Sequence, residues 1–213
     1  MFIQPIYNIL LLQDVTYFFK KDFFGEKYDA LAADHDILFM FLKEDVEGRN
    51  YLAEDFYPVG LLARIENISE EDVVQIRTIE RVEILNPQID GGNISAAYAV
   101  RPSVEDMPEE EQQEIFSSLR SALLRFVQGY QWGLWARGYI LQRKNAYDLI
   151  SSLSEYLNLS PEEKYQILSA DSVRSRYELI RQAVNEFMEI AKVSAGAQEA
   201  QKGDQEQLYR EAA

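Results

Sequence analysis

Apolar and polar residues alternate with a period of two through much of the first hundred residues. Residues 57–68, 72–85 and 94–100 place apolar side chains at every second position, which is the pattern of half-buried β-strands. Residues 36–42, "DILFMFL", are apolar on both faces and predict a strand at the centre of a sheet. The glycine-rich "DGGN" at residues 90–93 predicts a turn between the last two strands.

One helical pattern lies within this β-rich part of the chain, over residues 25–35, "GEKYDALAADH". Several short strands separated by turn-rich segments favour a small, partly closed barrel or a sandwich. We therefore expect residues 1–105 to form a β-rich unit that contains one short helix.

From about residue 106 the apolar period changes to 3.6 residues. Apolar side chains form one stripe over residues 115–127 and a second stripe over residues 173–188, as in amphipathic helices. Helices joined by short loops favour a bundle. The sequence thus predicts an α+β fold, in which a helical bundle over residues 106–193 follows the β-rich unit.

Two helix starts carry capping signals. Asp106 and Glu109 have the spacing of a capping box ahead of the first stripe. Ser160, Pro161 and Glu163 combine a capping hydroxyl, a proline suited to the first helical turn and an acid that closes the box. We expect one helix to begin after each signal.

The end of the chain changes character again. Residues 194–205, "SAGAQEAQKGDQ", lose the apolar period and predict a polar linker. Residues 206–213, "EQLYREAA", then have the composition of the first two turns of another helix. We expect residues 194–213 to form a linker and the start of a long helix.

Composition restricts the class of protein. The formal charge is −15, from 36 acidic and 21 basic residues, which argues against binding to nucleic acid because phosphate contacts need basic side chains. The absence of cysteine excludes disulfides and thiolate chemistry and favours the cytoplasm. The longest apolar run, residues 37–42, is far shorter than the about 20 residues of a membrane span.

Catalytic and metal-binding motifs are missing from the sequence, so we predict no catalytic, cofactor-binding or metal site. His35 is the one histidine, and we expect a solvated or capping role for it. No glycine-rich phosphate loop is followed by Lys and Ser or Thr. The acidic pair Glu54–Asp55 and the acidic run 105–114 fit a solvated surface better than general acids.

Two aromatic segments are candidate contact surfaces for a substrate or partner. Tyr17, Phe18 and Phe19 lie in "VTYFFKKDFF", and Trp132 and Trp135 lie in the glycine-rich "GYQWGLWARGY". Such rings can bind exposed apolar segments of another protein. The alternative is that they fill the protein's own core, in the β-rich unit and between two helices respectively.

The order of these segments resembles the N-terminal domain of the ATP-dependent protease Lon. The chain has segments similar to those of that family in the same order, over nearly its whole length. They are Pro5 with "ILLLQDVTYF" (9–18), then "DILFMFLKED" (36–45), "EDFYPVGLLARI" (54–65), "IERVEIL" (79–85) and "YDLISSLSEYLNLSPEEKYQILSADSVRSRYELI" (147–180).

The resemblance implies a β-barrel-like (PUA-like) first unit and a non-catalytic role in recognising unfolded or damaged polypeptides. It also implies self-association within a hexameric parent, whose ATP- and Mg-dependent ATPase and serine–lysine peptidase would follow residue 213. The segment "EQLYREAA" resembles the start of the long helix that leads to them. Two alternatives are a structural role in ring assembly and a stand-alone adaptor of the same domain type.

Overall fold

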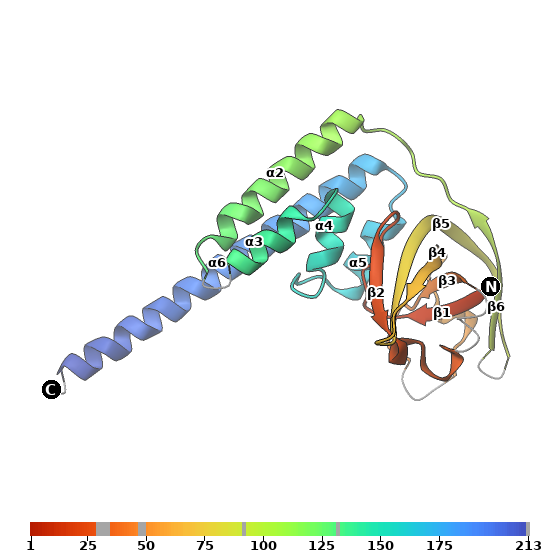
Figure 1. The fold of residues 1–213 in the computed structure, drawn as a ribbon, viewed down its shortest axis with the longest axis horizontal. Coiled ribbons are helices and arrows are strands. Elements are labelled where there is room, and N and C mark those ends of the chain that lie inside the picture. The colour runs from red at the N-terminus through yellow and green to blue at the C-terminus, as the bar shows by residue number, and fades with distance from the viewer. Residues whose placement is uncertain (29–34, 47–49, 91–92, 131–132, 212–213) are drawn as a thin grey trace.

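Six strands form one mixed sheet. The computed structural model describes residues 1–28, 35–46, 50–90, 93–130 and 133–211, and for residues 26–27 and 194–211 it describes the backbone alone. The strands are β1 (Phe2–Ile6), β2 (Thr16–Lys20), β3 (Asp36–Phe41), β4 (Val59–Ile68), β5 (Val73–Asp90) and β6 (Asn93–Val100). Their order is β1-β3-β4-β5-β2, and β6 pairs with the later part of β5 (Figure 1). β1 runs parallel to β3, and the other pairs are antiparallel.

The predicted barrel is not closed. β1 and β2 end the strand order, and no pairing joins them in the described part of the chain. Pro5 and residues 9–18, one of the segments that resemble the family, do not form a single strand, because β1 ends at Ile6 and β2 begins at Thr16. Asn8 and Asp14 have φ of 57° and 59° and turn the chain out of the sheet between them. Leu10, Leu11 and Leu12 are buried in the main core along this connection.

The two faces of the sheet bury different clusters, and β3 supplies both. Ile37, Phe39 and Phe41 belong to the main core, which also contains the buried residues of the helices. Leu38 and Met40 belong to a smaller cluster on the opposite face, together with residues of β4, β5 and the segment before η2. The prediction of a central strand covered on both sides is therefore confirmed.

Among the described residues, five α-helices follow the sheet and two short 3₁₀ helices lie between strands. The bounds are η1 (Lys21–Lys27), η2 (Ala53–Asp55), α2 (Glu109–Val127), α3 (Gly133–Leu141), α4 (Ala146–Leu153), α5 (Pro161–Ser169) and α6 (Val173–Glu211). α2 packs against α3, α4 and α6, and α5 packs against α6. These contacts confirm the α+β class. They do not establish a separate helical bundle, because the main core is continuous from the sheet into the helices. The division at residue 105 stays a prediction.

α6 is longer than the sequence suggests. It extends as one rod past α2 and α3, with its C-terminal end far from the sheet (Figure 1). Residues 194–205, expected as a polar linker, belong to this helix, and the division of the chain at residue 193 stays a prediction. Alanine, glutamine, glutamate and lysine dominate this segment, and all four have high helix propensity even without an apolar stripe.

The capping predictions have different outcomes. The Ser160 hydroxyl accepts a hydrogen bond from the Glu163 amide, and the Glu163 carboxylate accepts one from the Ser160 amide, so this capping box is confirmed. The box at Asp106 is wrong, since α2 has Pro108 at its N-cap. The Asp106 carboxylate instead accepts from the Arg174 amide at the start of α6.

The helix predicted over residues 25–35 is described only at its start. η1 ends at Lys27 and contains Gly25 with φ of 58°, so the chain is not regularly helical there. Residues 29–34 lie outside the described residues. His35 is exposed, as expected, and directly precedes β3. Asp55, expected at the surface, is buried, and its carboxylate accepts a hydrogen bond from the Leu52 amide.

Candidate functional site

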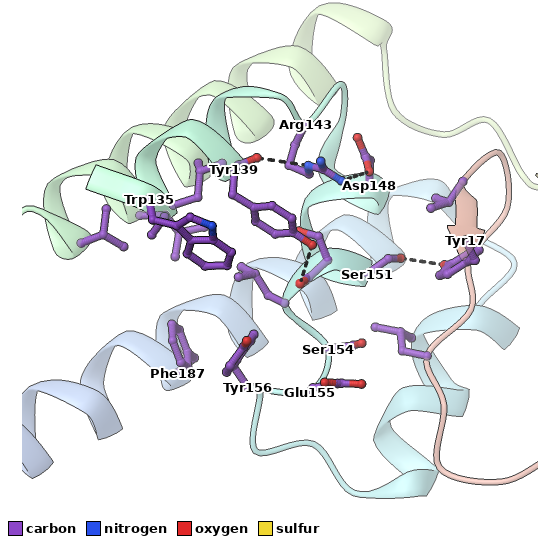
Figure 2. A pocket seen from close by; sticks show the side chains of 18 of the residues that line it. Tyr17, Trp135, Tyr139, Arg143, Asp148, Ser151, Ser154, Glu155, Tyr156 and Phe187 are labelled. Atoms are coloured by element: carbon purple, nitrogen blue, oxygen red, sulfur yellow. Dashed lines mark hydrogen bonds and ion pairs between the residues drawn. The ribbon is translucent and has the colours of Figure 1, made fainter. Parts of the chain in front are cut away.

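A groove of about 1160 Å³ lies where β2 meets the helices. Its walls come from β2, the last turn of α2, the helices α3 and α4, the turn after α4, and α6 (Figure 2). Most of the lining side chains are aromatic or aliphatic. Its volume slightly exceeds the range of about 300–1,000 Å³ that is typical of small-molecule pockets.

Aromatic rings form one side of this groove. Trp135 and Tyr139 of α3 stack, with ring centroids 5.6 Å apart. Phe126 of α2 and Phe187 of α6 meet edge to face at 5.7 Å. Trp135 is 68% exposed and Tyr156 is 64% exposed, and both rings line the groove (Figure 2). Large rings at this exposure favour contact with an apolar partner.

An ion pair joins the connection after α3 to α4 along the groove. Arg143 Nη1 lies 3.1 Å from Asp148 Oδ1, and the guanidinium lies 4.6 Å from the centre of the Tyr139 ring. The Asp148 carboxylate also accepts a hydrogen bond from the Lys144 amide, and Asn145 caps α4 by accepting from the Asp148 amide. The wall behind the aromatic rings is therefore fixed by partnered polar groups.

Tyr17 fixes β2 against α4. Its hydroxyl accepts a hydrogen bond from the Leu12 amide at 2.7 Å and is hydrogen-bonded to the Ser151 hydroxyl at 2.8 Å (Figure 2). Burial raises the pKa of the Tyr17 phenol far above its usual value, so the phenol stays neutral at physiological pH. Tyr17 thus acts as a rigid side of the groove.

The structure brings together four of the five predicted contact residues. Tyr17, Phe18, Phe19 and Trp135 all line the groove, although β2 and α3 are far apart in the sequence. Phe18 is 68% exposed, whereas Phe19 stacks on Phe23 against the main core. The core interpretation is therefore confirmed for Phe19, and contact of the exposed Phe18 ring with a substrate or partner stays a prediction. Trp132 lies outside the described residues.

The sequence did not indicate three aromatic residues of the groove. Phe126 and Phe187 were assigned to the apolar stripes of helices, and they do pack on the core while also lining the groove. Tyr156 lies in the turn after α4 and carries no periodic signal. The sequence marked the groove only through the two aromatic segments around Tyr17 and Trp135.

The described residues contain no group of three or more His, Cys, Asp or Glu side chains able to hold a metal ion. Among the same residues, no helix has the length and apolar character needed to cross a membrane.

A family model described as the ATP-dependent protease La (LON) substrate-binding domain matches residues 22–186. The chain belongs to the Lon substrate-binding domain family. The match includes α3, α4 and the first part of α6, but β2 with Tyr17, Phe18 and Phe19 lies before it. The family description thus concerns binding of a substrate rather than catalysis.

One curated relative is the Lon protease of Clostridium beijerinckii, with 24% identity over 177 residues. The match covers 81% of this chain and 22% of that protein, so the chain spans about a fifth of the relative's length. Among solved structures, the N-terminal domain of the Mycobacterium avium complex Lon protease matches with a TM-score of 0.57 and 16% identity. That match covers 86% of this chain and 96% of the other. This likeness shows that the Lon N-terminal domain fold is shared.

Proposed function

We propose that this chain is the substrate-binding part of a Lon-type, ATP-dependent serine protease, and that the groove between β2 and the helices binds unfolded or damaged polypeptides. The single observation that carries the proposal is the exposure of Trp135 and Tyr156 in a groove whose other walls are rigid. The family description and the name of the Clostridium relative support a protease as the parent. ATP and Mg would bind to that parent outside this chain.

Apolar burial gives the physical basis of this function. Unfolded proteins expose aromatic and aliphatic side chains that native proteins bury, and burial in the groove contributes about 25 cal/mol per Å². One such contact is weak, but several copies of the groove in one assembly would bind a long client by effective concentration. The domain would therefore retain unfolded clients and release native ones.

The test is a titration of the 213-residue chain with a fluorescently labelled protein, reduced and unfolded in one series and native in the other. We expect binding to the unfolded form alone, measured as fluorescence anisotropy. Trp135→Ala is expected to weaken that binding by about tenfold, as for a central aromatic contact. Equal anisotropy curves for the unfolded and native forms would overturn the proposal.

Leu134→Ala supplies the matched control. Leu134 is the neighbour of Trp135 on α3 and is 88% exposed, but it does not line the groove. Its replacement removes a large exposed apolar side chain from the same helix and should leave the affinity within about twofold. Equal losses in the two variants would point to non-specific apolar contact instead of the groove.

A second function, support of ring assembly, is favoured by α6. This helix is 39 residues long and its later half extends away from the sheet and the other helices (Figure 1). A helix of that kind can act as a spacer between this domain and the rest of a parent. We expect removal of residues 1–193 from the parent to lower the number of subunits per assembly, obtained from light scattering as the assembly mass divided by the mass of the shortened subunit. An unchanged number of subunits would exclude the assembly role.

A further inference from the structure

β2 has one unpaired edge, and the register shows which backbone groups lie on it. β2 pairs only with β5 among the described strands. On either side of this pairing, the Thr78 amide donates to the Val15 carbonyl at 3.0 Å and the Lys21 amide donates to the Asp72 carbonyl at 2.9 Å. Residues 15 and 21 thus direct their backbone groups toward β5.

Backbone groups alternate in direction along an antiparallel strand. Because residues 15 and 21 face β5, so do Tyr17 and Phe19, and Thr16 and Phe18 direct their N–H and C=O groups outward. Within the described part of the chain, no hydrogen bond reaches these outward backbone groups. An edge of this kind is a template for another extended chain.

The unpaired edge lies along the groove. Four consecutive residues of β2, Thr16 to Phe19, line the groove. Successive side chains of a strand point to opposite faces of the sheet, so a groove lined by all four runs beside the strand instead of over one face. The outward backbone groups of Thr16 and Phe18 therefore border the aromatic surface that contains Trp135 and Tyr139.

The charges at the groove favour a basic partner. Three charged residues line it, and two of them, Arg143 and Asp148, neutralise each other in an ion pair. The third is Glu155, which is exposed. The chain as a whole carries a net charge of −15, so the surrounding field also attracts positive charge.

We propose that an extended polypeptide segment, apolar at alternate positions and bearing Lys or Arg, adds as a strand to the outer edge of β2. The outward amides and carbonyls of Thr16 and Phe18 pair with its backbone, and alternate side chains enter the aromatic groove. This inference rests on the proposed function and specifies its binding mode. Strand addition explains why this domain would bind unfolded chains in preference to native ones, because the backbone N–H and C=O groups of a native protein already have hydrogen-bond partners.

The first test uses wild-type chain and three synthetic ten-residue peptides of alternating apolar residues and lysine. One peptide is unmodified, and the other two carry N-methyl groups on opposite alternate sets of amides. Methylation blocks hydrogen bonding along one edge and leaves every side chain in place. We expect one methylated peptide to bind at least about tenfold more weakly than the unmodified peptide, and the other to bind within about twofold. Equal affinities of the two methylated peptides would overturn the strand addition.

The second test compares Phe18→Pro with Phe18→Ala. Both variants remove the exposed ring, but only proline removes the outward N–H, which β5 does not use. Tyr17 is already extended, as a residue before proline requires. We expect Phe18→Pro to bind the unmodified peptide about fivefold or more weakly than Phe18→Ala. Circular dichroism checks that both variants fold, and the methylated peptides test the wild-type chain in either case. Equal affinities of two folded variants would overturn the proposal.

These results separate the binding mode from the function. Binding of unfolded protein that depends on Trp135, but is insensitive to N-methylation and to Phe18→Pro, would overturn strand addition and leave the proposed function standing. Absence of binding to every unfolded probe would overturn both. A loss of affinity when a lysine-to-glutamate version of the peptide is used would support the basic preference, and an equal affinity would contradict it.

Discussion

Two regions join the sheet to the helices. One buries a charged side chain among several hydrogen-bond acceptors, and the other leaves aromatic rings exposed to solvent. In the first, the Arg81 guanidinium is 0% exposed and donates to the carbonyls of Ser169 and Ala170 at the end of α5. It also donates to the Pro102 carbonyl and forms an ion pair of 3.2 Å with Asp171. We call this region the arginine junction. The second region is the groove, where aromatic rings stay exposed.

Because of this difference in exposure, we expect the arginine junction to determine stability and the groove to determine binding. A buried guanidinium needs several acceptors, and the arginine junction supplies them from α5 and from the connection after β6. The groove instead leaves Trp135 and Tyr156 largely exposed, and within the described part of the chain the outward backbone groups of β2 have no hydrogen bond. This exposure costs little stability and makes these groups available to a ligand. Substitutions in the first region should act on folding, and those in the second on affinity.

The largest effect is expected from Arg81→Ala. The substitution removes the donor for several carbonyls and leaves the junction without its central charge, so the free energy of unfolding should fall by about 3–5 kcal/mol. Urea denaturation followed by circular dichroism measures it. Arg77→Ala is the matched control on the same strand, since its ion pair with Asp14 at 3.9 Å is exposed and contributes about 0.5 kcal/mol or less. Similar losses of unfolding free energy in Arg81→Ala and Arg77→Ala would show that the buried arginine junction contributes no more stability than an exposed ion pair.

Tyr17→Phe should give the next largest loss of stability, because the groove borders on the core at this residue. The substitution leaves the Leu12 amide without its acceptor and removes the bond to Ser151, which should cost about 1–2 kcal/mol. Tyr98→Phe changes an exposed tyrosine of β6 and serves as the control. No measurable difference between the two variants in urea denaturation would show that Tyr17 does not fix β2 to α4.

The pH dependence of stability should report on Asp171. Hydrogen bonds from Arg101 hold the pKa of the Asp171 carboxyl below its ordinary value of 3.8, so it contributes stability above that value. The contribution is lost as pH falls through the lower folded-state pKa. The loss should be below about 1 kcal/mol, because the Asp171 side chain is 44% exposed and solvent screens the pair.

Asp171→Asn should remove this part of the acid dependence. The measurement is the free energy of unfolding between about pH 5 and pH 2, in wild type and variant. Glu155→Gln offers a control carboxyl at the groove, outside the arginine junction. Identical acid profiles for wild type and Asp171→Asn would contradict a stabilising role of this carboxylate.

The smallest change in stability is expected from Trp135→Ala, the variant with the largest expected change in affinity among the groove residues. Its ring is mostly exposed and loses one stacking contact with Tyr139, so the free energy of unfolding should fall by less than about 1 kcal/mol. Thermal unfolding of Trp135→Ala and Leu134→Ala should give similar midpoints. A much lower midpoint for Trp135→Ala would assign that ring to the core and not to the groove.

Much of the fold could be predicted because its signals are local. The alternation in residues 72–85 and the stripes of α2 and α6 reflect burial of one face, which a strand or helix expresses within a few residues. The capping box at Ser160 is equally local, since both of its hydrogen bonds join residues three positions apart. These features do not depend on what the element packs against.

Other features depended on residues that are distant in the sequence. Asp106 has the spacing of a cap for α2, but the carboxylate accepts from α6, which lies 68 positions further along the chain. Arg81 reads as a polar residue on an alternating strand, and only the end of α5 explains its burial. The open edge of the sheet likewise showed no local signal.

The sequence by itself determined the order and type of most elements, the lack of catalytic motifs in the chain and the aromatic segments worth inspecting. Only the tertiary structure decided that Tyr17, Phe18 and Trp135 share one groove, that β2 ends the strand order, and that Arg81 is sealed between sheet and helices. The reason is physical: periodicity records which face of an element is buried, whereas a groove or a buried charge depends on which distant element covers that face.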